Sequence, residues 1–153
     1  MRVKDLMSQP VHTCKLDQSV LTAAQIMWER DCGIVPVVDD NYRLVGVITD
    51  RDICMAALFT NRPLSEINVA AVMASDVSTC GPEDPIIDAE HMMSSRQVHR
   101  LPVVNESGAP TGLLSLADVA RKLRSNGAKS SPAAADLAET MAAICEPHQG
   151  TTH

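Results

Sequence analysis

The feature that most constrains this sequence is an internal repeat. Pro36 recurs as Pro102 and Gly46 recurs as Gly112, each 66 residues later and with no insertion between them. A repeat of this size indicates a structural unit that cannot bury enough surface alone, so the two copies should form one compact module. The same spacing relates Met7 to Met73, Thr13 to Thr79, Cys14 to Cys80, Ala23 to Ala89, Met27 to Met93, Thr49 to Ser115 and Asp52 to Asp118.

The repeat divides the 153-residue chain into four segments. The first copy covers residues 3–59 and the second covers 69–124, with a linker over 60–68. The composition then shifts to Ser, Gly, Lys and Ala. We therefore expect a flexible tail over 125–153, in which residues 133–145 form a short helix.

Each copy has the pattern of an α+β unit. In the first copy, strands are predicted near 34–38 and 44–48 from short apolar runs joined by turn residues. A strand near 11–14 and a helix beginning around Ser19 precede them, and a helix over 50–59 follows. Since the second copy repeats this order, the sequence predicts two β-α-β-β-α repeats.

Charge and composition exclude several classes of protein. A net charge of −6 argues against a general nucleic-acid or anionic-membrane surface, which needs clustered Lys and Arg. Neither a signal peptide at Met1 nor an apolar run long enough to cross a bilayer is present, so we expect a cytoplasmic protein. Five cysteines without a Cys-x-x-Cys pair indicate reduced thiols rather than a disulfide framework or zinc knuckle.

The candidate site lies where each predicted hairpin meets the next helix. Thr49-x-x-Asp52 and Ser115-x-x-Asp118 both follow a buried strand and open a helix. Each pair can act as a capping box, in which hydroxyl and carboxylate satisfy free backbone amides. The same position favours a bound anion, because the amides and the helix dipole present positive charge there. Both interpretations stay open at this point.

These residues resemble a known family, the CBS (cystathionine-β-synthase) domain. The marks are the apolar-Pro-Val-Val strand, the Gly-apolar-apolar-Thr/Ser-x-x-Asp segment and the repeat spacing, which together cover about four fifths of the chain. The chain looks like a stand-alone bacterial-type CBS pair, or Bateman module. The resemblance implies an α+β module with pseudo-two-fold symmetry and a cleft on each side. It also implies a homodimer that pairs through its helices.

The resemblance further implies a site for an adenine nucleotide. In that family the matching Asp binds the ribose hydroxyls, the Thr or Ser lies near ribose or phosphate, and adenine packs beside the apolar-Pro strand. Carried over to this sequence, the implied contacts are Thr49, Asp52, Val35, Pro36, Ser115, Asp118, Leu101 and Pro102. Arg51, Arg100 and His99 are the basic residues best placed to meet phosphates, although Arg51 could equally be a solvated helix residue.

Three functions remain in view. Because no catalytic or phosphate-loop motif is present, we expect no enzyme and no required cofactor. The leading hypothesis is a regulatory module that binds AMP, ADP, ATP, NAD or S-adenosylmethionine and acts on an unidentified regulated protein. A second is a ligand-free interaction protein that works through dimerisation or stress-related contacts. A third is a metal-binding protein built on His12, Cys14, Cys145, His148 and His153.

The two copies are not expected to bind ligand equally. Arg51 stands beside Asp52, whereas the sequence preceding Asp118 offers no basic neighbour. A charge-assisted bond to phosphate is worth about 1.5–3 kcal/mol. The site at Asp52 is therefore predicted to bind a nucleotide more tightly, and the site at Asp118 to prefer a nucleoside-like ligand.

Overall fold

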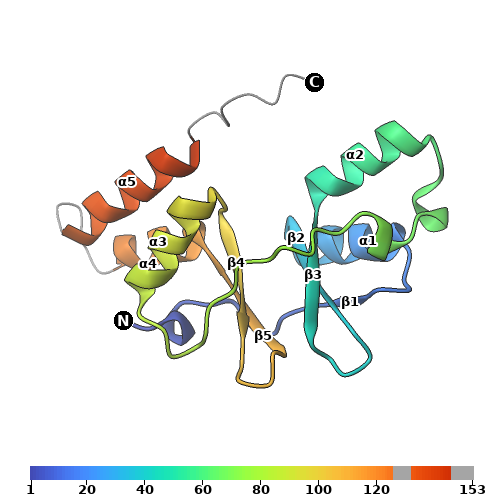
Figure 1. Cartoon of the computed structure of the whole chain (residues 1–153). Coiled ribbons are helices and arrows are strands. Elements are labelled where there is room, and N and C mark those ends of the chain that lie inside the picture. The colour runs from blue at the N-terminus through green and yellow to red at the C-terminus, as the bar shows by residue number, and fades with distance from the viewer. Residues whose placement is uncertain (126–131, 146–153) are drawn as a thin grey trace. The chain divides into compact units, whose positions relative to one another are not determined.

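The computed structural model describes residues 1–125 and 132–145, which form two compact units (Figure 1). The described elements confirm the predicted α+β class. In this part of the chain no helix is long and apolar enough to span a membrane. The strands are β1 (Cys14–Lys15), β2 (Ile34–Val38), β3 (Leu44–Thr49), β4 (Arg100–Val104) and β5 (Pro110–Ser115), and the α-helices are α1 (Val20–Arg30), α2 (Asp50–Thr60), α3 (Ile86–Arg96), α4 (Leu116–Ser125) and α5 (Pro132–Cys145).

Unit 2 consists of Pro10–Val77 and Val104–Pro110 and contains the first repeat copy. Its sheet has the order β1-β2-β3, with β1 parallel and β3 antiparallel to the central strand. All five residues of β2 are buried, which is typical of a strand covered on both faces. Its core is aliphatic and is formed by Val20, Ala23, Met27, Val35, Val37, Ile48, Ile53, Ala56, Ile67 and Val69, with Cys14.

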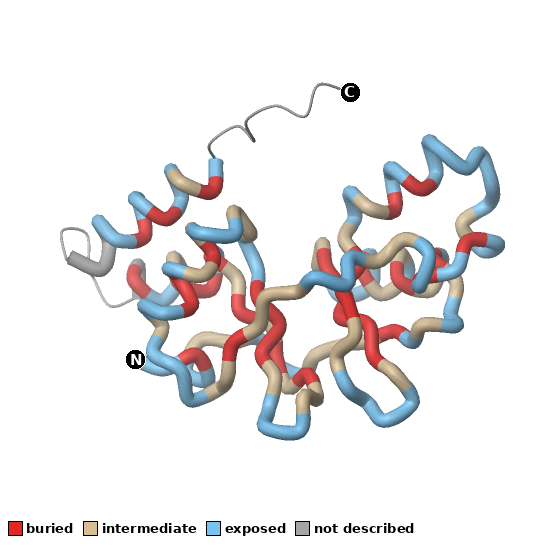
Figure 2. The backbone as a smooth tube through the Cα atoms, viewed as in Figure 1, coloured by how far each residue is buried: buried red, intermediate tan, exposed pale blue. Residues whose placement is uncertain are grey.

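Unit 1 consists of Met1–Gln9, Ser78–Val103 and the chain from Thr111 onward. Its sheet pairs β4 with β5, and a single parallel bridge from Cys80 to Val103 stands where the first copy has β1. Helices α3, α4 and α5 share the core of this unit, with α5 packed on α3 and α4, and Figure 2 shows buried stretches along these helices. The core comprises Val3, Cys80, Ala89, Met93, Leu101, Val103, Leu114, Leu116, Val119, Leu123, Leu137 and Ile144.

The two repeat copies exchange their leading segments. The short 3₁₀ helix η1 (Val3–Asp5) begins the first copy but belongs to unit 1, where the Val3 amide donates to Asp84 O at 3.0 Å. The matching helix η3 (Val69–Ala71) begins the second copy but belongs to unit 2, where the Val69 amide donates to Gln18 O at 2.9 Å. Each copy is thus completed by the leading segment of the other copy.

The repeated glycines are explained by this exchange. A Cβ atom on Gly46 would lie 2.6 Å from Met73 Sδ, and one on Gly112 would lie 2.7 Å from Met7 Sδ. Both distances are shorter than real carbon–sulfur contacts allow, and backbone oxygens lie close to the same positions. A glycine is therefore required in the second strand of each hairpin, where the residues that follow the exchanged helix cross it closely.

We predict that Val3→Ala destabilises unit 1 and not the repeat copy that follows it in sequence. Val3 is fully buried, and its truncation should reduce the free energy of unfolding by about 1–3 kcal/mol. Amide hydrogen exchange should accelerate in α3, β4 and β5. The matched variant Val69→Ala should accelerate exchange in α1, β2 and β3 instead. Faster exchange in α1 to β3 for Val3→Ala would contradict the segment exchange.

We also predict that Gly46→Ala and Gly112→Ala each lower stability by about 1–3 kcal/mol, because the added methyl group displaces the crossing segment. Gly81→Ala serves as the control, since its nearest neighbour is the movable carboxylate of Asp84 at 3.3 Å. Urea denaturation measures all three variants. A smaller loss for Gly46→Ala than for Gly81→Ala would argue against the close crossing.

Candidate functional site

The first candidate junction joins β3 to α2 through a complete capping box. The Thr49 hydroxyl accepts from the Asp52 amide at 3.2 Å and donates to Asp52 Oδ2 at 2.8 Å. The same Oδ2 accepts from the Thr49 amide at 2.8 Å. One carboxylate oxygen is therefore committed to the cap. Asp52 Oδ1 has no hydrogen bond to any residue that the structure describes.

The second junction, between β5 and α4, repeats this arrangement. Asp118 Oδ2 accepts from the Ser115 amide at 2.8 Å and from the Ser115 hydroxyl at 2.6 Å. The Asp118 amide returns a bond to that hydroxyl at 3.2 Å. The capping interpretation is thus correct at both junctions. It accounts for only one oxygen of each carboxylate.

The remaining oxygens of the two carboxylates differ. Asp118 Oδ1 accepts from the Arg121 guanidinium and, at 3.4 Å, from the Ser8 hydroxyl, and only 8% of Asp118 is exposed. The sequence-based expectation that Asp118 lacks a basic neighbour was therefore wrong. Arg121 lies three residues further along α4, and this spacing brings it onto the same helix face. At the matching position of α2 stands Met55, which cannot form such a pair.

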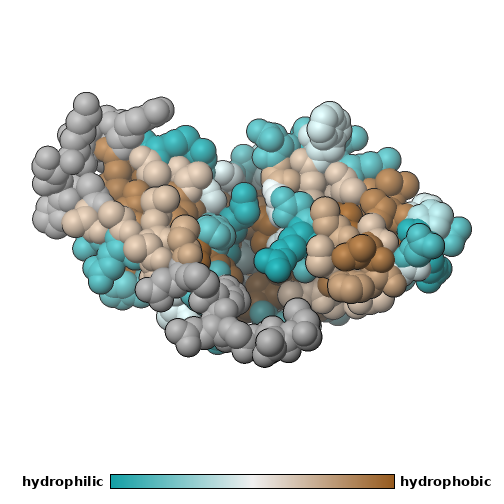
Figure 3. Space-filling view, turned by 90° about the horizontal axis from the view of Figure 1, so that it is seen from above, coloured by the Kyte–Doolittle hydropathy of each residue, from teal (hydrophilic) through white to brown (hydrophobic). Residues whose placement is uncertain are grey.

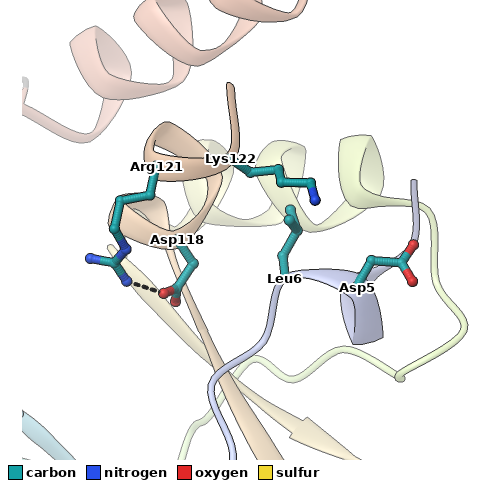
Figure 4. A pocket seen from close by; sticks show the side chains of 5 residues that line it. All are labelled: Asp5, Leu6, Asp118, Arg121 and Lys122. Atoms are coloured by element: carbon teal, nitrogen blue, oxygen red, sulfur yellow. Dashed lines mark hydrogen bonds and ion pairs between the residues drawn. The ribbon is translucent and has the colours of Figure 1, made fainter. Parts of the chain in front are cut away.

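Each carboxylate opens onto a pocket within its own unit. The pocket at Asp118 has a volume of about 270 Å³ and is mainly charged, as Figure 4 shows. The pocket at Asp52 has a volume of about 420 Å³ and presents Met55 and Phe59. Repeat-related positions line both pockets, but Arg121 in the first is replaced by Met55 in the second. The first pocket is lined by Asp5, Leu6, Asp118, Arg121 and Lys122.

A further pocket of unit 1 collects three of the residues suggested by the sequence. His99, Arg100 and Ser115 line a space of about 440 Å³ at the start of α4. The Leu116 amide donates to His99 O at 3.0 Å, which holds the start of the helix beside the start of β4. Met141 of α5 lines the same pocket. Sequence reasoning missed Met141, because the repeat pattern has no counterpart for α5.

The other suggested contacts lie elsewhere. Val35 and Pro36 of β2 are buried in the core of unit 2, and Leu101 and Pro102 of β4 are buried in unit 1. Their side chains hold the strands in place, so only their backbone edges could meet a ligand. Arg51 is exposed on α2, and its guanidinium has no hydrogen bond or ion pair to a described residue.

The repeated cysteines behave as small buried hydrophobes. Burial raises the pKa of the Cys14 thiol to about 11. Burial, together with the nearby Asp84 carboxylate, raises that of Cys80 to about 12. Both thiols are therefore protonated at neutral pH, which disfavours the thiolate needed for metal binding. Among the described residues no group of three or more His, Cys, Asp or Glu is arranged to hold a metal, and the suggested His148 and His153 lie outside those residues.

Comparison with known proteins identifies relatives of the whole repeat region. The CBS domain-containing protein YhcV of Bacillus subtilis is 32% identical over 124 residues, which cover 81% of this chain and 86% of YhcV. The CBS domain pair of protein MJ0100, solved with 5′-methylthioadenosine and S-adenosyl-L-methionine, is 27% identical with a TM-score of 0.73 and covers 82% of this chain and 98% of that one. The structure of Hypoxic Response Protein I with two coordinated zinc ions is 28% identical with a TM-score of 0.71 and covers 79% of this chain and 98% of that one.

The family model for the CBS domain matches both repeat copies, over residues 3–58 and 69–125. These matches include both hairpins and both capped carboxylates. This chain therefore belongs to the CBS domain family and carries two CBS domains in tandem.

Proposed function

We propose that this CBS pair is a regulatory module that binds an adenosine-containing small molecule, of the class of AMP, ADP, ATP, NAD or S-adenosylmethionine. The observation that carries the proposal is the repeated capping carboxylate that lines a pocket in each unit, with a second oxygen that at Asp52 has no hydrogen bond to a described residue. Binding would change the affinity for a regulated protein. No catalytic role and no permanent cofactor are proposed, since CBS domains are generally regulatory.

The chemistry at Asp52 suits a ribose. Its Oδ1 can accept hydrogen bonds from the two ribose hydroxyls, while Oδ2 stays in the cap. The amides at the start of α2 and the exposed Arg51 favour a phosphate near the same helix end. Met55 and Phe59 supply apolar surface against which a base can pack.

The chemistry at Asp118 is less favourable for a ribose. Its Oδ1 is already hydrogen-bonded to Arg121, so a ribose hydroxyl must share or displace that guanidinium. This ion pair is a second reason, beside the position of Arg51, for proposing that the Asp52 site is the tighter one. Arg100 and His99 line the neighbouring pocket and could offset part of the difference for an anionic ligand.

The relatives support an adenosine ligand and also supply an alternative. The MJ0100 pair was solved with two adenosine compounds. Both contain a ribose, whose hydroxyls can donate hydrogen bonds to a capping aspartate. Hypoxic Response Protein I carries zinc, so zinc belongs in the same binding screen. The ligand-free interaction function is the outcome in which neither binds.

We predict that Asp52→Asn weakens adenosine binding more than Asp118→Asn does. The asparagine keeps a cap acceptor but loses the charge, and a hydrogen bond to a charged group is worth about 1.5–3 kcal/mol, or about tenfold or more in affinity. Titration calorimetry with AMP and with 5′-methylthioadenosine measures both sites.

Asp50→Asn is the control, because Asp50 is exposed on the same helix turn and should leave affinity unchanged. Equal losses from Asp52→Asn and Asp118→Asn would remove the asymmetry. Failure of the unmodified protein to bind any adenosine compound would overturn the proposed function.

We also propose that the chain pairs with a second copy through α1 and α2. Three large apolar side chains lie open on these helices: Trp28 is 90% exposed, Phe59 80% and Leu58 67%. Figure 3 shows brown hydrophobic atoms at the surface on the side where α2 lies. Exposed aromatic residues of this kind are typical of protein interfaces.

The paired variant Trp28→Ser/Phe59→Ser is expected to dissociate this dimer, because it removes the two largest contacts without touching the core. Sedimentation velocity at micromolar concentration should change from a dimer to the monomer mass of 16.4 kDa. Glu29→Ala, an exposed substitution on α1, should leave the dimer intact. An unmodified protein that sediments as a monomer would rule the dimer out.

A further inference from the structure

Helix α5 is an addition to the repeat and packs on unit 1. Leu137 and Ile144 join the core of that unit, where they are 9% and 5% exposed. Gln97 Nε2 at the end of α3 donates to Ala143 O of α5 at 3.2 Å. Figure 1 shows α5 lying over α3 and α4. The helix therefore has a defined docking surface.

The differences between the two copies explain why this surface exists on one unit. On α4, Leu116 and Leu123 are each 8% exposed. Their repeat-related positions on α2 are Asp50 and Ala57, and both of these are exposed. The second copy thus carries leucines where the first is polar or small. A helix that packs on Leu116 and Leu123 of α4 therefore finds no leucine at the matching positions of α2.

Docking brings one side chain of α5 to the pocket of His99, Arg100 and Ser115, which neighbours the Asp118 pocket. Met141 lines the pocket of about 440 Å³ that also contains His99, Arg100 and Ser115. It is 47% exposed, so about half of its surface is free to contact a molecule in that pocket. The pocket then has a polar edge, formed by the hydroxyl and the two basic side chains. Its apolar wall consists of Leu116, Ala117, Ala120 and Met141.

We propose that the pocket of His99, Arg100 and Ser115, beside Asp118, is part of the unit 1 ligand site and that α5 completes it. We assign to Met141 the role of determining which ligand this site accepts. The flexible thioether chain packs against the apolar part of a nucleoside-like ligand, its base or a 5′-alkylthio group, while Ser115 and Arg100 contact the polar part. Ligand binding and α5 docking then stabilise each other by reciprocal linkage. This inference rests on the adenosine-binding function proposed above.

A buried carboxylate of α3 works against the docking of α5. Glu90 of α3 is only 5% exposed, and burial, reinforced by the Asp136 carboxylate of α5, raises its pKa while His91 opposes the shift. The ionised carboxylate is therefore more stable when α5 is released and Glu90 is returned to water. The hydrogen bond from Gln97 and the buried Leu137 and Ile144 oppose that release. Ligand contact with Met141 adds to the docked side of this balance.

The test uses calorimetry with 5′-methylthioadenosine in an Asp52→Asn background, which weakens the competing unit 2 site. Met141→Ala should lower affinity about tenfold, since it removes three non-hydrogen atoms of apolar contact. Because Met141 is half exposed, this variant keeps its fold. Leu137→Asp, which releases α5, should lower affinity at least as much. Glu139→Ala, an exposed change on the same helix, should have no effect.

A second readout is amide hydrogen exchange of α5, which should slow when 5′-methylthioadenosine is added to the Asp52→Asn protein. Unchanged affinity in Met141→Ala, or unchanged exchange in α5, would overturn the role of the helix while leaving adenosine binding intact. Absence of binding at both sites of the unmodified protein would instead overturn the function on which the inference rests.

Discussion

The capping box at each strand–helix junction is the interaction on which the candidate site depends. By using one carboxylate oxygen to satisfy the amide of the last strand residue, it fixes the direction in which α2 and α4 leave the sheet. The same bond fixes the rotamer of the aspartate and so aims its second oxygen. The cap and the proposed ligand contact therefore share a single side chain. Removal of the carboxylate would loosen the helix start and empty the acceptor position together.

Around this shared frame the two units have become chemically different. Met55 and Arg121 occupy repeat-related positions, and only the arginine reaches back to the capped aspartate. Asp50 and Leu116 are likewise related, and only the leucine supports an additional helix. Unit 2 has a carboxylate oxygen without a partner among the described residues, beside a mostly apolar pocket, whereas unit 1 neutralises its carboxylate and gains α5. Under the proposed function, such a pair could report two ligands or two concentrations of one ligand.

Much of this architecture could be predicted from the sequence, because the hairpins and the Thr/Ser-x-x-Asp segments are local patterns. The pairing of Arg121 with Asp118 is local too, and the i,i+3 spacing could have revealed it. The exchange of η1 and η3 could not be predicted, since the periodicity is the same whichever copy each segment joins. The place of Met141 was also hidden, because it depends on how a helix outside the repeat packs on α4.

The exchanged segments determine the order in which the two units can fold during synthesis on the ribosome. The core of unit 2 lacks Val69 until the chain has emerged beyond the first repeat, but it can then form while the second copy is still being made, and Val104–Pro110 joins the unit later. Val3, the first residue of the unit 1 core to emerge, must wait for partners as distant as Leu114 and Val119. The N-terminal segment is thus without its packing partners through most of synthesis, with the slow closure and exposure to misassembly that long-range contacts bring. Unit 1 contains the N-terminal segment of the sequence and is nevertheless the unit that completes its core last.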